Sequence, residues 1–249
     1  MHDEIAGLLQ EMDAGVVTHS IGRRDYHAGS LHGQPCVIVL ARIGKVAAAA
    51  TTVTLIREFD VQKIVFTGLA GAVAPGIRVG DVVVADRLLQ HDLDVSPLFP
   101  QYEVPLLGRS YFDTCSQLSD HLSQCMQDYL HHDFNERIDL ETRKRFGLTV
   151  PAVHRGIIIS GDQFVGDARS VQALRTALPK ALCVEMEGAA VAQICYEYDI
   201  PFTVLRTISD SADEQASFDF SAFLEHVARH YSAGVLRRFL LNPVPDVLN

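Results

Sequence analysis

Strand-length apolar runs and helix-length amphipathic segments alternate along much of the chain. The apolar runs lie between glycines and charged residues, and they predict strands at Tyr26–Leu31, Cys36–Ala41, Lys63–Thr67, Gly80–Ala85, Gly156–Ser160, Ala181–Glu185 and Pro201–Ile208. Helical spacing of apolar residues predicts helices at Asp3–Met12, Gly44–Phe59, Gly188–Tyr198 and Phe220–Leu241. The alternation predicts one α/β domain over residues 1–249, a three-layer α/β/α sandwich with a mixed central sheet.

The segment from about Phe112 to Val153 breaks this alternation. It is polar, it favours helices, and it lacks a strong strand pattern. We interpret it as a helical excursion from the sheet and not as a second domain.

The formal net charge of −10 makes nucleic acid an unfavourable partner, because an acidic surface repels phosphates. No apolar run reaches the roughly 18 residues that a membrane span needs. The N-terminus is acidic and does not resemble a signal peptide. We therefore expect a cytoplasmic protein with no membrane partner.

The five cysteines form no CxxC pair, and three of them, Cys36, Cys183 and Cys195, lie in apolar runs. We expect reduced, structural thiols, without a disulfide framework or a zinc site.

Ligands of open α/β sheets bind beyond the carboxyl ends of the strands, so the residues that follow each strand are the candidates for chemistry. One such segment, Gly68–Gly71, is a small-residue turn whose backbone, including Ala70 and Gly71, can approach a ligand closely. It lacks the spacing of dinucleotide-binding and P-loop motifs, so neither a dinucleotide nor ATP is indicated.

The sequence Val184-Glu185-Met186-Glu187-Gly188 places two carboxylates at a strand-to-helix junction. A helix dipole explains one glutamate there. Two glutamates in so apolar a setting need partners, because a buried charge is costly. The two hydroxyls of a ribose diol are suitable donors to such a carboxylate.

Asp210 follows Ser209 at the end of a predicted strand. From its position alone, two roles fit equally well. It can cap a turn or helix, or it can act as a general acid that protonates a purine leaving group.

Seven segments together resemble the 5′-methylthioadenosine/S-adenosylhomocysteine nucleosidases of the nucleoside phosphorylase superfamily, in that family's order and with nearly its spacing. They are Ile43–Ala49, Thr67–Gly71, Val79–Val84, His91–Val95, Ser160–Phe164, Val184–Glu187 and Arg206–Asp210. The resemblance covers almost the whole chain and is weakest between Phe112 and Val153. It implies a nucleoside phosphorylase-like fold.

The resemblance also implies a role for each site residue. Asp210 would protonate adenine N7, with Ser209 supporting it, and Glu4 would be the general base. Glu187 would bind the ribose diol, Met186 would pack under the sugar, and Glu185 would steady the site. The remaining substrate contacts are the ring of Phe164 on the purine, the backbone of Val165 at its N1/N6 edge, and Phe220 over the 5′ side.

The chain departs from the family in two places. Leu69 stands where the family usually has a serine near the ribose, and the family's first strand is absent before Glu4. Terminal segments fray unless they are tied down. We therefore expect the chain as written to be poorly active and less stable than a version with roughly ten more N-terminal residues of strand character.

The expected reaction is irreversible hydrolysis of 5′-methylthioadenosine or S-adenosylhomocysteine to adenine and a 5-thioribose, without a cofactor or metal. The first alternative to a hydrolase is a phosphorylase. Its phosphate substrate would need a group of cationic side chains, and the only candidates near Gly68–Gly71 are Arg42 and Arg206. A nucleosidase for aminodeoxyfutalosine or AMP, and a non-catalytic nucleoside-binding protein, are further alternatives.

The segment His91–Phe112 carries many apolar residues: Leu98, Phe99, Tyr102, Leu106, Leu107, Tyr111 and Phe112. The resemblance implies that this loop completes the 5′ pocket of a neighbouring chain. The alternative is that it covers the protein's own core. We favour the homodimer, because so apolar a loop is better suited to an interface than to solvent.

Overall fold

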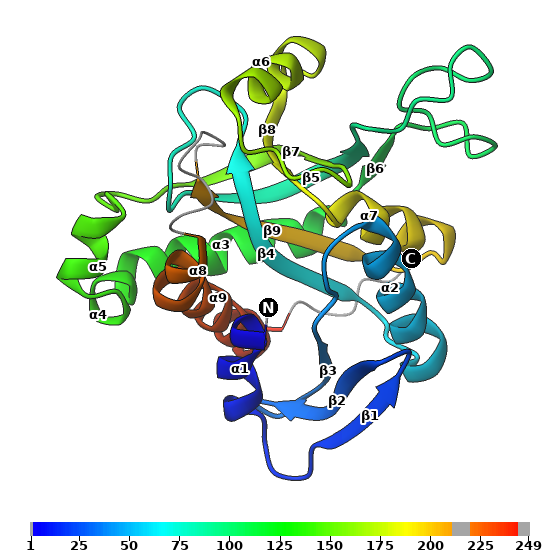
Figure 1. The fold of residues 1–249 in the computed structure, drawn as a ribbon. Coiled ribbons are helices and arrows are strands. Elements are labelled where there is room, and N and C mark those ends of the chain that lie inside the picture. Colours follow the sequence, from blue (N-terminus) through cyan, green and yellow to red (C-terminus); the bar gives the residue numbers. More distant parts are fainter. Residues whose placement is uncertain (1, 211–219, 244–249) are drawn as a thin grey trace.

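The computed structural model describes residues 2–210 and 220–243, and the side chains of residues 5–210 and 222–243. A mixed six-stranded sheet forms its centre (Figure 1). The strands lie in the order β6 (Tyr111–Asp113), β5 (Val82–Gln90), β7 (Val153–Ser160), β8 (Ala181–Glu185), β4 (Ile64–Ala72) and β9 (Phe202–Asp210). The start of β5 also pairs with β9, the last strand in this order, so the sheet curves round on itself.

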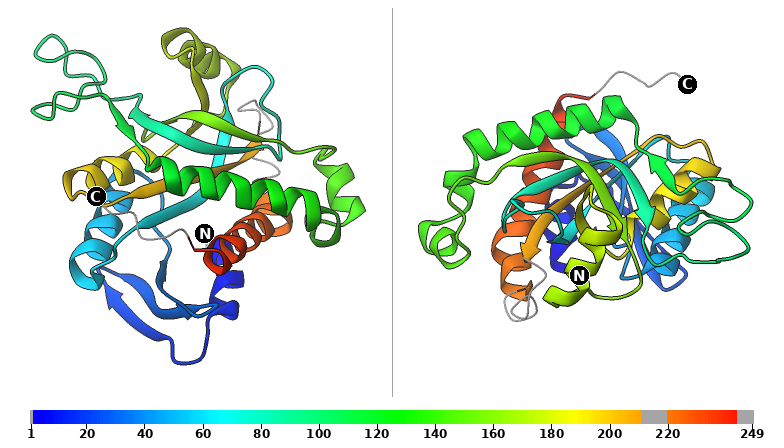
Figure 2. Two further views of the ribbon diagram at one scale, coloured as in Figure 1. Left: turned by 180° about the vertical axis from the view of Figure 1, so that it is seen from behind. Right: turned by 90° about the horizontal axis from the view of Figure 1, so that it is seen from above.

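Helices cover both faces of this sheet, which confirms the predicted three-layer architecture (Figures 1 and 2). On one face lie α2 (Lys45–Phe59) and α7 (Gly188–Glu197). On the other lie α3 (Ser116–His132) and the continuous segment formed by α8 (Phe220–Phe223), the π-helical turn η1 (Leu224–Ala228) and α9 (Arg229–Leu241). The shorter helices are α1 (His2–Glu11), α4 (Phe134–Arg137), α5 (Leu140–Arg145) and α6 (Ala168–Ala177).

The β5 strand shows how the sequence divides the core into two halves. Successive side chains of a strand point to opposite faces of its sheet. Accordingly, Val82 and Val84 pack with α3 and α9, whereas Val83 and Ala85 pack toward α2 and α7. All four are fully buried, so this stretch is continuously apolar and does not alternate with polar residues.

Two predictions about the N-terminal third were wrong. Tyr26–Leu31 and Cys36–Ala41 do not extend the central sheet. They correspond to β2 (Arg24–Leu31) and β3 (Gln34–Val39), which form a separate antiparallel sheet with β1 (Val17–Ile21). The side chains of β3 are only partly buried, because this small sheet has helix packing on part of its surface and solvent on the rest.

Strand boundaries also differ from the prediction. Gly68–Gly71 is not a turn but the second half of β4, where it pairs with β9. The next strand begins at Val82 and not at Gly80, which has a φ of +88° and lies in the preceding turn. The segment predicted as helical at about Phe112–Val153 contains α3, α4 and α5, and Leu118, Leu122 and Met126 bury the inner face of α3 in the core.

Candidate active site

Three strands bring the predicted site residues together at one end of the sheet. Gly71 of β4 pairs with Val184 of β8 and with Asp210 of β9. The carboxylates that follow Val184 are therefore placed on the same strand end as Ser209 and Asp210. Ala70 and Gly71, which the sequence analysis assigned to the ligand's surroundings, lie between them.

A β-bulge orients the residues at the end of β9. Ala70 pairs with Ile208 and Gly71 pairs with Asp210, so Ser209 has no partner on β4. Such a bulge changes the direction in which the neighbouring side chains point. The Ser209 hydroxyl donates to Oδ2 of Asp210 at 2.6 Å and also lies 3.5 Å from the carbonyl oxygen of Ala70. The largely buried carboxyl of Asp210 is thus held in one orientation, as a proton donor requires.

Both oxygens of the Glu185 carboxylate accept several hydrogen bonds from protein donors. Oε1 accepts from Ser160 Oγ and from the Gly188 N–H, and Oε2 accepts from the N–H groups of Glu187 and Gly188. Oε2 also accepts from Nε and Nη2 of Arg206, at 3.1 and 2.6 Å. Because these protein donors surround both oxygens, Glu185 fastens the N-terminus of α7 to β7 and β9. This arrangement fits the steadying role that the resemblance implied.

Arg206 joins the carboxylates of the candidate site, a structural role that was not predicted from the sequence. Its side chain is fully buried, and its guanidinium lies 4.1 Å from the ring centroid of Phe66. Its Nη1 is a buried donor that has no hydrogen-bond partner among the described residues. Burial disfavours the charged form, but the carboxylates of Glu185 and Glu187 outweigh this and raise the pKa of Arg206. The sequence contains one signal for this role, an arginine inside the apolar strand Pro201–Ile208, because a buried charge is costly unless it has a partner.

Glu187 lies at the N-cap position of α7, and its carboxylate joins two other segments. Oε1 accepts from the N–H of Gly44 at 2.9 Å, and Oε2 lies 3.9 Å from Nη2 of Arg206. The side chain is 16% exposed, so a ligand can reach it while most of it is shielded from water. Met186, the neighbouring residue, is half-buried.

The loop after β7 carries the expected purine contacts. The ring of Phe164 is 58% exposed, and a Cβ on Gly166 would lie only 2.7 Å from it. Val165 is partly buried against the end of the sheet. The loop thus presents an exposed aromatic face, which a stacked purine would cover.

Two of the predicted site residues lie at the limits of the described region. Glu4 is within α1 and Phe220 begins α8, but the side chains of both are outside the described residues. Their roles, and the expectation about the N-terminal strand, stay predictions.

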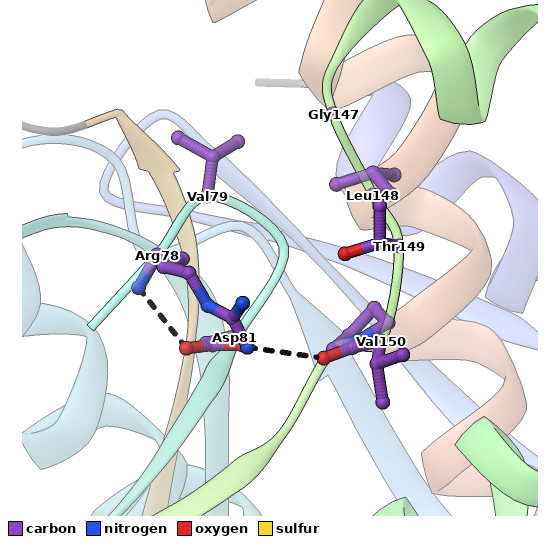
Figure 3. Close-up of a pocket in the computed structure, with 8 residues that line it drawn as sticks. Arg78, Val79, Asp81, Gly147, Leu148, Thr149 and Val150 are labelled. Carbon is purple, nitrogen blue, oxygen red and sulfur yellow. Dashed lines mark hydrogen bonds between the residues drawn. The ribbon is translucent and has the colours of Figure 1, made fainter. Parts of the chain in front are cut away.

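A small cavity of about 20 Å³ lies beside the turn that leads into β5, and Figure 3 shows its lining. Asp81 accepts there from the N–H of Arg78, and the Arg78 guanidinium reaches the carbonyl oxygen of Val150. The space suffices for about one water molecule and not for a nucleoside. The cavity therefore belongs to the packing of residues 147–151 against this turn.

Within residues 2–210 and 220–243, no helix is long and apolar enough to cross a membrane. In the same part of the chain, no three histidine, cysteine or acidic side chains gather as they would around a metal ion. All five cysteines are free thiols, and burial raises the pKa of Cys195 to about 12 and of Cys125 to about 11.

The chain matches known proteins over most of its length. Residues 1–241 match the model of the phosphorylase superfamily. The 5′-methylthioadenosine/S-adenosylhomocysteine nucleosidase of Anoxybacillus flavithermus is 31% identical over 93% of this chain and 91% of its own. The corresponding protein of Staphylococcus aureus is 34% identical, over 84% of this chain and 83% of its own.

Solved structures agree with these matches. The nucleosidase of the same name from Neisseria meningitidis, in complex with methylthio-immucillin-A, has a TM-score of 0.83 and 34% identity, covering 96% of this chain and 95% of its own. A futalosine hydrolase mutant of Helicobacter pylori has a TM-score of 0.81 and 30% identity, with coverage of 96% and 95%. The chain therefore belongs to the phosphorylase superfamily, in its branch of 5′-methylthioadenosine/S-adenosylhomocysteine nucleosidases.

Proposed function

We propose that this protein hydrolyses the N-glycosidic bond of 5′-methylthioadenosine, S-adenosylhomocysteine or both, releasing adenine and a 5-thioribose. The observation that carries the proposal is the pairing of Gly71 with both Val184 and Asp210, which unites the Glu185–Glu187 and Ser209–Asp210 segments at one strand end. Relatives that match most of this chain carry the name of this activity.

Asp210 serves as the general acid. It protonates N7 of adenine as the bond between C1′ and N9 breaks, so that the base leaves as a neutral molecule. Ser209 keeps the carboxyl in place through its 2.6 Å hydrogen bond. This assignment takes the catalytic reading of Asp210 over the capping reading, because the bulge and the Ser209 hydroxyl fix its carboxyl beside the Glu185–Glu187 segment.

The ribose acquires oxocarbenium character as the bond breaks, and Glu187 accepts hydrogen bonds from its two hydroxyls. Met186 packs under the sugar. Water then attacks C1′ and gives its proton to Glu4, which acts as general base. Arg206 holds Glu185 in place beside this site through its Nε and Nη2.

The adenine ring lies against the exposed ring of Phe164, and the backbone of Val165 recognises the N1/N6 edge of the adenine. Ala70 and Gly71 line the site beside Asp210, and Phe220 closes the 5′ side. All chemistry in this scheme comes from side chains and water, without a metal or organic cofactor.

The geometry favours hydrolysis over phosphorolysis. A phosphate co-substrate needs cationic donors, and the sequence offered Arg42 and Arg206 as candidates. The Arg206 guanidinium already serves Glu185 through two of its nitrogens. The Arg42 guanidinium donates to the carbonyl oxygen of Arg23, on the small antiparallel sheet.

We also propose that the protein is a homodimer that works in the cytoplasm. Leu98 and Leu106 are 79% and 92% exposed, on a loop that projects from the body of the molecule (Figures 1 and 2). A second copy would cover them. Phe112, by contrast, packs in the protein's own core. Five free thiols fit a reducing compartment.

The test is to incubate the purified protein with 5′-methylthioadenosine and S-adenosylhomocysteine, with and without phosphate, and to identify the products by NMR. We expect adenine and a free 5-thioribose in equal amounts, at a rate independent of phosphate. A sugar 1-phosphate would instead identify a phosphorylase. Aminodeoxyfutalosine belongs in the same panel, because a futalosine hydrolase is among the similar structures.

A further inference from the structure

Three loops beside Glu187 are joined by a closed ring of hydrogen bonds that the proposed chemistry does not use. The first loop, Gly44–Lys45, begins α2. The second loop follows β5 and contains Asp92, two residues beyond the end of the strand. The third loop follows β7 and contains Asp162, two residues beyond the end of that strand. These segments are distant in sequence, so a contact among them fixes the rim of the site.

Lys45 makes two of the bonds in this ring. Its Nζ donates to Oδ1 of Asp92 at 2.6 Å, and its backbone N–H donates to Oδ1 of Asp162 at 2.8 Å. The backbone N–H of Asp162 donates to Oδ2 of Asp92 at 2.8 Å, which closes the ring. Each of the three residues is thus bonded to the other two.

The ring is attached directly to the proposed ribose carboxylate. Gly44, the residue before Lys45, donates its N–H to Oε1 of Glu187 at 2.9 Å. A Cβ on Gly44 would lie 3.3 Å from Oδ1 of Asp162, and its φ of +96° suits glycine, so the chain passes close to Asp162 here. The third loop continues from Asp162 to Phe164 and Val165, the proposed purine contacts.

The ring holds the two carboxylates of Asp92 and Asp162 around a single cation, Lys45. The Lys45 side chain is 17% exposed, and its Nζ also lies 3.9 Å from Oδ2 of Asp162. Partial burial raises the pKa of Asp92, but the hydrogen bonds from Lys45 and from the Asp162 backbone outweigh this and lower it overall. The carboxylate of Asp92 is therefore ionised at neutral pH and keeps Lys45 in place.

We propose that Lys45 is a positioning residue, and that the Lys45–Asp92–Asp162 ring holds the Gly44 N–H against Glu187 and thereby sets the orientation of the ribose carboxylate. This inference rests on the proposed function for the role of Glu187. Lys45 itself touches no reacting atom. It acts by fixing the Gly44 loop, which bonds to Glu187, and the Asp162 loop, which continues to Phe164 and Val165. A small misplacement of such groups lowers the rate strongly.

The test compares Lys45→Met with Lys45→Arg, which keeps the charge, and with Lys63→Met, which makes the same change at an exposed lysine outside the site. We expect Lys45→Met to lower kcat/KM for 5′-methylthioadenosine about 10-fold, Lys45→Arg to recover much of this loss, and Lys63→Met to have no effect. With the 3′-deoxy analogue, which lacks one diol hydroxyl, the loss in Lys45→Met should shrink to less than about 3-fold.

A second readout does not depend on activity. Amide hydrogen exchange over residues 42–48 should be faster in Lys45→Met than in wild type, because the Gly44 and Lys45 N–H groups lose their fixed acceptors. If wild type fails to hydrolyse any of the nucleosides, the proposed function is wrong, and the exchange rates still decide whether the ring exists. Unchanged exchange in Lys45→Met, or an equal loss of activity on both substrates, would overturn the inference.

Discussion

Arg206 and Glu185 form a fully buried ion pair, with Nη2 of Arg206 2.6 Å from Oε2 of Glu185 and side chains that are 1% and 2% exposed. Arg206 lies in the middle of β9 and Glu185 ends β8, so the pair joins the strand that ends at Asp210 to the strand that Glu187 follows. Buried pairs contribute little net stability when both partners are present, but they are costly to break, because one charge is then left without compensation.

The first prediction follows from this pair. Glu185→Gln leaves the Arg206 cation buried without a full counter-charge, and we expect the free energy of unfolding to fall by about 3 kcal/mol. Urea denaturation measures the change. The control is Asp113→Asn, which breaks the exposed pair with Arg87 and should cost less than about 1 kcal/mol. Equal effects of the two substitutions would contradict the argument.

The second prediction concerns the packing of α9 on α3. A Cβ on Gly234 would lie 2.1 Å from the ring of Tyr129, so Gly234→Ala overpacks the core and should cost about 1–3 kcal/mol of stability. A Cβ on Gly7 in α1 would have no atom of the described residues within 4 Å, and Gly7→Ala should stabilise the protein by about 0.5–1 kcal/mol. Melting temperatures distinguish the two, and a stabilised Gly234→Ala variant would show that the helices are not packed this closely.

The third prediction is a pH dependence of stability. Burial lowers the pKa of His91 below its ordinary value of 6.5, since its ring packs against Gly161 with Nε2 buried. The neutral form is thus favoured in the folded state, whereas the unfolded chain binds a proton more readily. The contribution is complete above about pH 6.5 and is lost as the pH falls toward the folded pKa. His230, whose pKa is also lowered by burial, adds to the same trend.

We therefore expect the free energy of unfolding to decline between pH 7 and pH 5, and His91→Gln to reduce the decline. Replacing the exposed His131 by glutamine should leave the slope as in wild type. The contribution of Asp92 to the free energy of unfolding is lost in a lower pH range, because the pKa of its folded form lies below 3.8. Chemical denaturation at several pH values gives the slopes, and a stability that rises toward pH 5 would reverse the sign predicted here.

The sequence predicted the layers of the fold because buried strands such as Val82–Ala85 carry continuous apolar runs, which are typical of strands covered on both faces. It misplaced Cys36–Ala41 for the same reason, since an apolar run does not reveal which sheet a strand joins. It also ended β4 at Thr67, because the glycines beyond it suggested a turn. Gly68 is needed inside the strand, because a Cβ there would lie 2.5 Å from Nη1 of Arg206.

The site was predictable where carboxylates follow strands, as with Glu187 and Asp210. The contributions of Lys45, Asp92 and Asp162 could not be read from the sequence in the same way. Each is an ordinary charged residue in a loop, and only the fold shows that they bond to one another. Ser209 likewise gains its role from a bulge that no local pattern announces.

The most direct test of the account is the rate of adenine release from 5′-methylthioadenosine by Asp210→Asn, compared with wild type and with Asp60→Asn. Asp60 is exposed at the end of α2 and has no place in the proposed mechanism. We predict that Asp210→Asn retains its fold and loses about 10²–10⁴-fold in turnover, the usual contribution of a general acid, while Asp60→Asn matches wild type. Turnover of Asp210→Asn within a few-fold of wild type would contradict the proposed mechanism.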